Sequence, residues 1–171
     1  MNYAPSRRSD GTIQTARVKQ AWPREKLFRI LTIDGGGIRG IFPAAYLAEI
    51  EKRFLSGASI ANYFDMVAGT STGGIIALAL AHGLTAQDAL KIYTDRGERI
   101  FPPRSGIKKW ARNFRWLFKP KHNQNTLKNE LLEVFGDAVL DEAKTRLVIP
   151  SFEGLHGEPF LYKTPHHPDG A

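Results

Sequence analysis

The sequence predicts an α/β protein built around a largely parallel sheet. Two short apolar segments, the first of them rich in β-branched residues, each run into a glycine-rich turn, and apolar residues at helical spacing follow each turn. This is the pattern of successive β–α units. Two further apolar segments, residues 147–149 and 159–162, are predicted to be strands. The chain has 171 residues, a length typical of one domain or of part of a larger one.

The predicted strands and helices follow a polar N-terminal segment. Residues 1–26 are polar and aperiodic, which predicts a flexible tail and places the folded domain at residues 27–171. Residues 27–33 and 65–68 predict the two strands that precede the glycine-rich turns. Apolar residues at helical spacing predict helices over residues 41–55, 75–82, 85–97, 107–118 and 127–135.

Local signals mark the ends of several predicted helices. Pro43 lies in a first turn, where its missing N–H is tolerated. Gly83 and Gly136 follow the last apolar residues of two helices and are predicted to end them. Thr85 is predicted to be an N-cap, with Asp88 at the position where a capping box usually has Glu or Gln.

The composition excludes several classes of site. The chain has no cysteine, which excludes disulfides, thiolate metal sites and a cysteine nucleophile. No apolar run approaches the roughly 18 residues of a membrane span, and the N-terminus has no apolar signal-peptide core, so a cytoplasmic location is expected. A metal site at His166, His167 and Asp169 is not expected because adjacent side chains on an extended segment point to opposite faces. No cofactor is expected.

The positive charge is concentrated in one segment. The net charge is +7, and residues 104–121 alone contain seven Lys and Arg residues and no acid. Apolar and aromatic residues recur there at helical spacing, as in a helix that lies in a membrane interface. The segment therefore predicts contact with a phospholipid membrane surface at the inner face of the membrane. A core-packed helix with a solvated basic face is the alternative, and nucleic-acid binding is not expected because no nucleic-acid-binding motif accompanies the segment.

The second glycine-rich turn predicts a nucleophile. Residues 69–73 fit G-x-S-x-G between a strand and a helix, the context of a nucleophile elbow. Gly69 and Gly73 flank Ser71 because such a sharp turn leaves no room for side chains, and the turn exposes the Ser71 hydroxyl at the sheet edge. The alternative is an ordinary turn that caps a helix.

The first turn, residues 35–40, has the form G-x-G-x-x-G. A dinucleotide site would need an acidic residue at the end of the next strand, and a P-loop would need G-K-[ST]; neither is present. Carboxyl ends of parallel strands share one sheet edge, so the two turns are expected to face each other. We predict that the N–H groups of Gly36 and Gly37, with Ile38 as a further candidate, form an oxyanion hole. Close packing of helix on strand is the alternative reason for the glycines.

Together, the motifs at residues 33–40 and 69–74 resemble those of patatin-like phospholipases, and the resemblance extends over about residues 28–162. It implies a patatin-like three-layer α/β sandwich with a largely parallel central sheet. It also implies a serine lipid acyl hydrolase that cleaves acyl esters of membrane glycerophospholipids. The resemblance places the nucleophile on Ser71, the oxyanion glycines on Gly35, Gly36 and Gly37, and a basic residue that anchors the loop or the anion on Arg39. A surface ion pair is the other interpretation of Arg39.

The resemblance also requires a catalytic base, the Asp of a D-G-[GA] motif that follows a strand. Asp169 begins such a motif, but Pro165 and Pro168 argue against a strand before it. The favoured interpretation is a family member that is incomplete at its C-terminus, so an inactive fragment that binds a membrane or a partner is one alternative function. A Ser-His-Asp carboxylesterase is another, because the chain order permits a late histidine as base, although a surface position is favoured for each of His156, His166 and His167.

Overall fold

In the computed structural model, the described residues are 27–100, 124–154 and 157–164. The predicted tail and the basic segment 104–121 lie outside them. The predictions made for those two segments therefore remain predictions.

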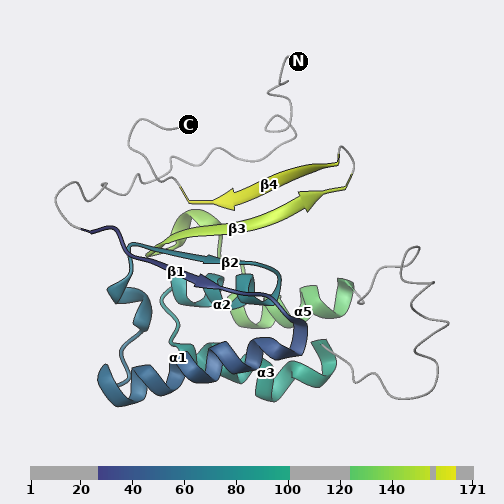
Figure 1. Cartoon of the computed structure of the whole chain (residues 1–171). Coiled ribbons are helices and arrows are strands. Elements are labelled where there is room, and N and C mark those ends of the chain that lie inside the picture. Colours follow the sequence, from purple (N-terminus) through teal and green to yellow (C-terminus); the bar gives the residue numbers. More distant parts are fainter. Residues whose placement is uncertain (1–26, 101–123, 155–156, 165–171) are drawn as a thin grey trace.

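Four strands form one sheet in the order β1-β2-β3-β4 (Figure 1). The first three, β1 (Ile30–Ile33), β2 (Met66–Gly69) and β3 (Arg146–Glu153), run parallel. The last, β4 (Glu158–Lys163), is antiparallel to β3. The prediction of a largely parallel sheet is confirmed.

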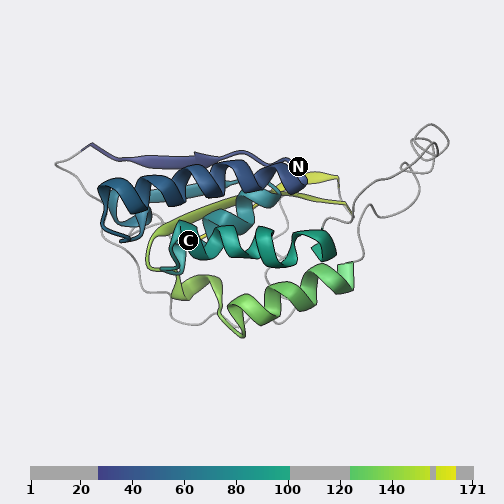
Figure 2. The same cartoon turned by 90° about the horizontal axis from the view of Figure 1, so that it is seen from below.

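The helices of the described part lie on one side of the sheet (Figure 1). Helix α2 (Thr72–Ala81) packs against β1, β2 and β3, and α3 (Ala86–Ile100) packs against the other side of α2. Helix α3 runs between α1 (Ile41–Phe54) and α5 (Gln124–Phe135), as Figure 2 shows from below. Helix α2 is apolar on all sides, as expected for a helix enclosed between a sheet and another helix.

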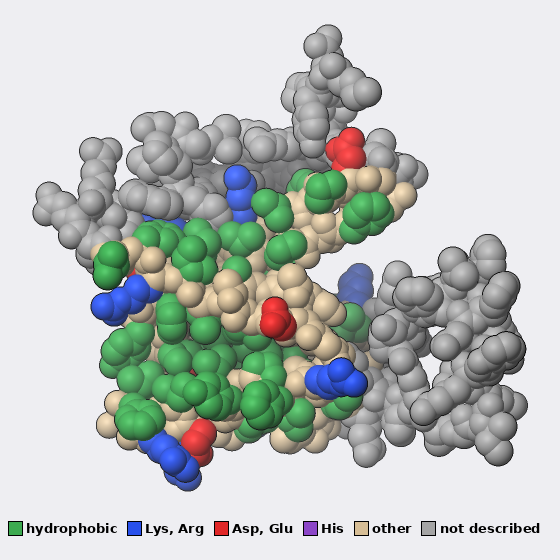
Figure 3. All heavy atoms as spheres, in the orientation of Figure 1, with side chains coloured by type: hydrophobic (Ala, Val, Ile, Leu, Met, Phe, Trp, Pro, Cys, Tyr) green, Lys and Arg blue, Asp and Glu red, His purple; other side chains and the backbone are tan. Residues whose placement is uncertain are grey.

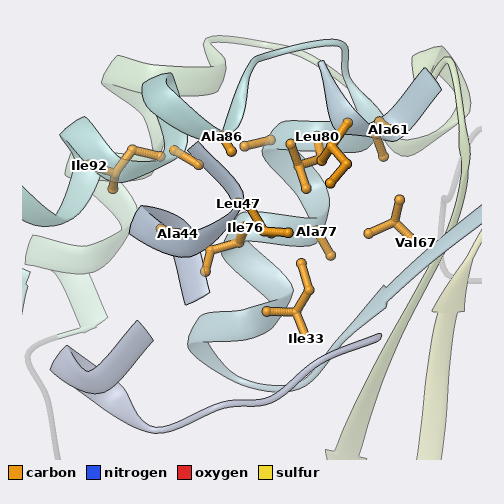
Figure 4. Close-up of a cluster of buried hydrophobic side chains, with 14 of the residues drawn as sticks. Ile33, Ala44, Leu47, Ala61, Val67, Ile76, Ala77, Leu80, Ala86 and Ile92 are labelled. Atoms are coloured by element: carbon orange, nitrogen blue, oxygen red, sulfur yellow. The ribbon is translucent and has the colours of Figure 1, made fainter. Parts of the chain in front are cut away.

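The core lies between the sheet and α2 and continues on the other side of α2 toward α1 and α3 (Figure 4). Ile76, Leu80 and Val67 are fully buried, and burying each such side chain contributes about 1.5–3 kcal/mol. Alanines at Ala44 on α1 and Ala86 on α3 are also fully buried.

Several element boundaries differ from the prediction, among them the starts of β1 and α5 and the end of α3, and packing explains two of the differences. Helix α2 begins at Thr72, three residues before the predicted start, although glycines weaken helices. A Cβ placed on Gly73 would lie 2.2 Å from the carbonyl oxygen of Ile33, so this turn has no room for a larger residue. Strand β3 continues through Pro150. Pro150 lies beyond Val148, the last β3 residue paired with β2, so the missing N–H of the proline breaks no hydrogen bond to β2.

Glu51 joins three helices from a buried position. Its side chain lies on α1 and is 2% exposed. One carboxylate oxygen accepts a hydrogen bond from the amide of Ile60 at 2.8 Å, and the other accepts one from the amide of Ala86 at 2.7 Å. Ile60 is the first residue of the 3-10 helix η3 (Ile60–Tyr63). Both amides belong to helix N-termini, which have no intrahelical partners. Glu51 therefore caps two helices from a third.

The predicted capping box at the start of α3 is confirmed with Asp as the acid. The Asp88 amide donates a hydrogen bond to the Thr85 hydroxyl oxygen at 3.1 Å. The Thr85 hydroxyl in turn donates to the Asp88 carboxylate at 2.7 Å. This hydrogen bond is the main cause that lowers the pKa of Asp88, and the bond from Lys91 adds to it. The charged form is therefore favoured by the fold.

Asp88→Asn is expected to lower the free energy of unfolding at pH 7 by roughly 0.5 kcal/mol. Because the pKa of Asp88 is lower in the folded state, its stabilisation is complete above the unfolded pKa of about 3.9 and is lost as the pH falls through the folded pKa. Urea unfolding of both proteins between neutral and acidic pH should show the difference shrinking on acidification. Equal stability at pH 7 would show that the charge of Asp88 contributes nothing.

Candidate active site

Ser71 occupies the turn between β2 and α2 in an unusual backbone conformation. Its φ is 52° and its ψ is −120°, a region that residues with a Cβ rarely adopt and that costs on the order of 1–3 kcal/mol. The side chain is exposed. The structure thus has the sharp strand-to-helix turn that the G-x-S-x-G motif predicts, with a serine presented at its apex.

The glycines that flank Ser71 are required by contact between backbones. A Cβ on Gly69 would lie 2.2 Å from the carbonyl oxygen of Gly73, and Gly73 in turn packs on the end of β1. Side chains at either position would push the turn away from the sheet. The positive end of the α2 dipole also lies at Ser71, where it favours negative charge.

The glycine-rich loop after β1 lies directly against this turn, as the parallel arrangement predicts. A Cβ on Gly35 would lie 2.9 Å from the Cβ of Ser71 and 2.7 Å from the carbonyl oxygen of Thr70. The Gly35 amide donates to the Thr70 hydroxyl oxygen at 3.1 Å. Gly35 therefore ties the two turns together, and its amide is already occupied in this structure.

Gly36 and Gly37 have the backbone conformations that glycine favours, with φ of 154° and 62°. Within the described part of the chain, no hydrogen bond uses the amide of either residue. A Cβ on Gly37 would meet no atom within 4 Å, so the space beside it is open. Ile38 follows in the 3-10 helix η2 (Gly37–Gly40). The Arg39 side chain is exposed and lies over Gly36. A Cβ built on Gly36 would stand 3.3 Å from the Cβ of Arg39.

Tyr93 is part of the site, although the sequence pattern places it only on the buried face of a helix. Its hydroxyl donates to the carbonyl oxygen of Thr72 at 2.9 Å, and the side chain is 3% exposed. Burial raises the pKa of Tyr93 to about 12, so the phenol is neutral at physiological pH. The available signal was a tyrosine on an otherwise apolar face, because a buried phenol needs a polar partner.

An apolar surface adjoins the glycine loop. Figure 3 shows hydrophobic side chains gathered over α1. On this helix, Phe42 is 74% exposed and its ring stacks on that of Tyr46 at 6.4 Å between centroids. Ile38, in the loop itself, is 47% exposed. The glycine loop thus packs against the turn that carries the exposed Ser71, and it leads directly into α1, which carries the exposed apolar side chains.

The remaining candidate residues lie outside the described part of the chain. These are Asp169, His156, His166 and His167. Within the described residues, no three acidic or histidine side chains are grouped closely enough to bind a metal ion. Over the same residues, none of the helices has the length and apolar character needed to cross a bilayer.

Comparison with known proteins relates this chain to one family by sequence. Residues 31–169 match the family model for the patatin-like phospholipase. Patatin-like protein 2 of Oryza sativa subsp. indica is 41% identical over 149 residues, covering 80% of this chain and 37% of that protein. The cGAMP-activated phospholipase of Vibrio cholerae is 33% identical over 150 residues, covering 82% of this chain and 42% of that protein. This chain thus spans about two fifths of the length of these relatives. The crystal structure of the type III effector protein ExoU matches 80% of this chain and 36% of its own at a TM-score of 0.39 and 16% identity.

Proposed function

Because the chain belongs to the patatin-like phospholipase family, we propose that it supplies the nucleophile and the oxyanion hole of a serine lipid acyl hydrolase. The substrates are acyl esters of membrane glycerophospholipids. One observation carries the proposal: Ser71 is exposed in a strained strand-to-helix turn, with the glycine loop packed against it. Strain of this kind concentrates at functional sites.

The proposed reaction begins with attack of the Ser71 hydroxyl oxygen on the ester carbonyl, while a base accepts the hydroxyl proton. The amides of Gly36 and Gly37 donate to the oxyanion that forms, and each such donor is worth about 3–4 kcal/mol of barrier. Collapse of the tetrahedral intermediate breaks the ester C–O bond, and the base returns its proton to the leaving oxygen of the lysophospholipid. Water then hydrolyses the acyl-enzyme and releases the fatty acid.

The chemical character of the surface supports a lipid substrate. Phe42 and Tyr46 expose aromatic rings on α1, the helix that follows the glycine loop in the chain, and burying that area against an acyl chain would be favourable at about 25 cal/mol per Å². A small polar ester would gain nothing from it. Attachment to an anionic membrane through the basic segment 104–121 remains a separate proposal.

The experiment is fatty-acid release from phospholipid vesicles by the purified protein and by its Ser71→Ala variant. Release that depends on Ser71 supports the proposal, whereas equal release by both proteins contradicts it. Asp169→Asn and His156→Ala in the same assay identify the base. A loss with His156→Ala in a folded protein favours the Ser-His-Asp carboxylesterase, and no release by the unchanged chain favours an inactive binding fragment.

Thr70→Val is expected to lower the rate of hydrolysis about tenfold. Valine keeps the shape of threonine but removes the oxygen that accepts the Gly35 amide, so the glycine loop loses its tie to the Ser71 turn. Thr70→Ser keeps an acceptor and should retain most of the rate. Initial rates of both variants on vesicles test this, and a Thr70→Val variant as fast as the unchanged protein would show that the bond has no part in activity.

A further inference from the structure

Tyr93 touches both of the turns that form the candidate site. The residue lies on α3, and its hydroxyl donates to the carbonyl of Thr72, which follows Ser71 in the chain. The phenol also lies against Gly40, the last residue of η2. A Cβ on Gly40 would stand 2.7 Å from the phenol oxygen and 2.9 Å from two ring carbons. One buried side chain thus contacts the end of the glycine loop and the start of the helix after Ser71.

We propose that Tyr93 is a positioning residue that fixes the Ser71 turn relative to the glycine loop. This inference rests on the proposed function. It explains the third glycine of the G-x-G-x-x-G motif, because any side chain at Gly40 would displace the phenol. Helix α3 supports the loop at a second point, where a Cβ on Gly97 would stand 3.2 Å from the Cδ1 of Ile38.

The physical reason is that this reaction depends on the distance between two separate turns. The Ser71 oxygen and the amides of Gly36 and Gly37 must meet the same carbonyl group, and a displacement of about 1 Å can cost about 100-fold in rate. The strained conformation of Ser71 also persists only where its surroundings hold it. A hydrogen bond to the adjacent carbonyl of Thr72, made by a side chain wedged against the loop, meets both needs.

The protonation state of Tyr93 makes this role independent of pH in the usual range. With the pKa of Tyr93 at about 12, the phenol keeps its proton and donates to Thr72 throughout neutral and mildly alkaline conditions. A residue that transferred the reacting proton would instead impose its own pH dependence on the rate.

The test is Tyr93→Phe, which removes one oxygen and keeps the ring. On phospholipid vesicles, kcat is expected to fall about tenfold with KM changed less than about twofold. The ratio of kcat values should be the same at about pH 6 and about pH 9. Tyr63→Phe is the matched control, because Tyr63 is 51% exposed on η3, which precedes the start of β2, whereas the Ser71 turn follows the end of that strand. Its kcat should not change.

Several outcomes would overturn the positioning role. One is an unchanged kcat in Tyr93→Phe; another is a loss of kcat that disappears at lower temperature, which would indicate reduced stability alone. Gly40→Ala keeps the Tyr93 hydroxyl but places a methyl group against it, so this variant should also lower kcat. If Tyr93→Phe does not fold, the kcat of Gly40→Ala tests the positioning role instead. An inactive Ser71→Ala with a fully active Tyr93→Phe contradicts only the role of Tyr93, whereas an active Ser71→Ala contradicts the proposed function itself.

Discussion

Ser71→Ala is expected to reduce fatty-acid release by about 10⁴- to 10⁶-fold because it removes the attacking oxygen. The neighbouring Thr70 hydroxyl accepts the Gly35 amide instead, and Thr72 is buried. By transition-state arithmetic the expected loss is about 5–8 kcal/mol of barrier. What remains would come from the oxyanion amides and from substrate binding. Alanine has the same backbone preferences as serine, so the strained turn and the thermal unfolding midpoint should be retained.

The matched control is Ser56→Ala. Ser56 is also an exposed serine with positive φ, at 51°, but it follows α1 rather than β2. Its replacement should leave release unchanged, which separates the loss of a nucleophile from the effect of altering a strained serine. Retention of more than about 1% of the rate in Ser71→Ala would contradict the assignment of Ser71.

Glu51→Ala is expected to lower the free energy of unfolding by about 3–5 kcal/mol. The change leaves the amides of Ile60 and Ala86 buried without their acceptor, and it creates a cavity where α1 meets η3 and α3. A loss of this size is a large part of the total stability of a typical domain, about 5–15 kcal/mol. Urea unfolding monitored by far-UV circular dichroism measures it.

Two further variants make the Glu51 result interpretable. Glu51→Gln keeps one acceptor oxygen but turns an NH₂ group toward the other amide, so an intermediate loss is expected. Glu49→Ala changes a carboxylate on the exposed side of the same helix, where it pairs with Arg53, and should have little effect. If Glu51→Ala unfolds at the same urea concentration as the unchanged protein, the double cap contributes nothing to stability.

The parts of the site that the sequence predicts are those encoded by local patterns. The turn around Ser71 and the loop around Gly36 follow from glycine spacing after apolar strands, and the parallel sheet then brings them to one edge. The start of α2 at Thr72 could not be predicted in this way. Helix propensity argues against the glycine at position 73, and the reason for it is the carbonyl of Ile33 on a neighbouring strand.

The supporting contacts depend on residues far apart in the chain. Thr70 and the Gly35 amide are 35 residues apart, and Tyr93 and Thr72 are 21 apart. No local pattern encodes such pairs, because they arise from how α3 and β1 pack around α2. A single sequence shows that Tyr93 is on a buried face but not which carbonyl its hydroxyl reaches. The same limit applies to Glu51, whose charge gives no sign of burial.

At Ser71, whose φ is positive, the residue that would be best for stability is not the residue that provides a hydroxyl. Glycine would relieve the steric penalty there, so Ser71→Gly would gain stability while removing the hydroxyl. Selection for expression yield or heat resistance alone would therefore favour that replacement. If the proposed function holds, relatives of this chain that had lost the activity would be recognisable by a third glycine between Gly69 and Gly73.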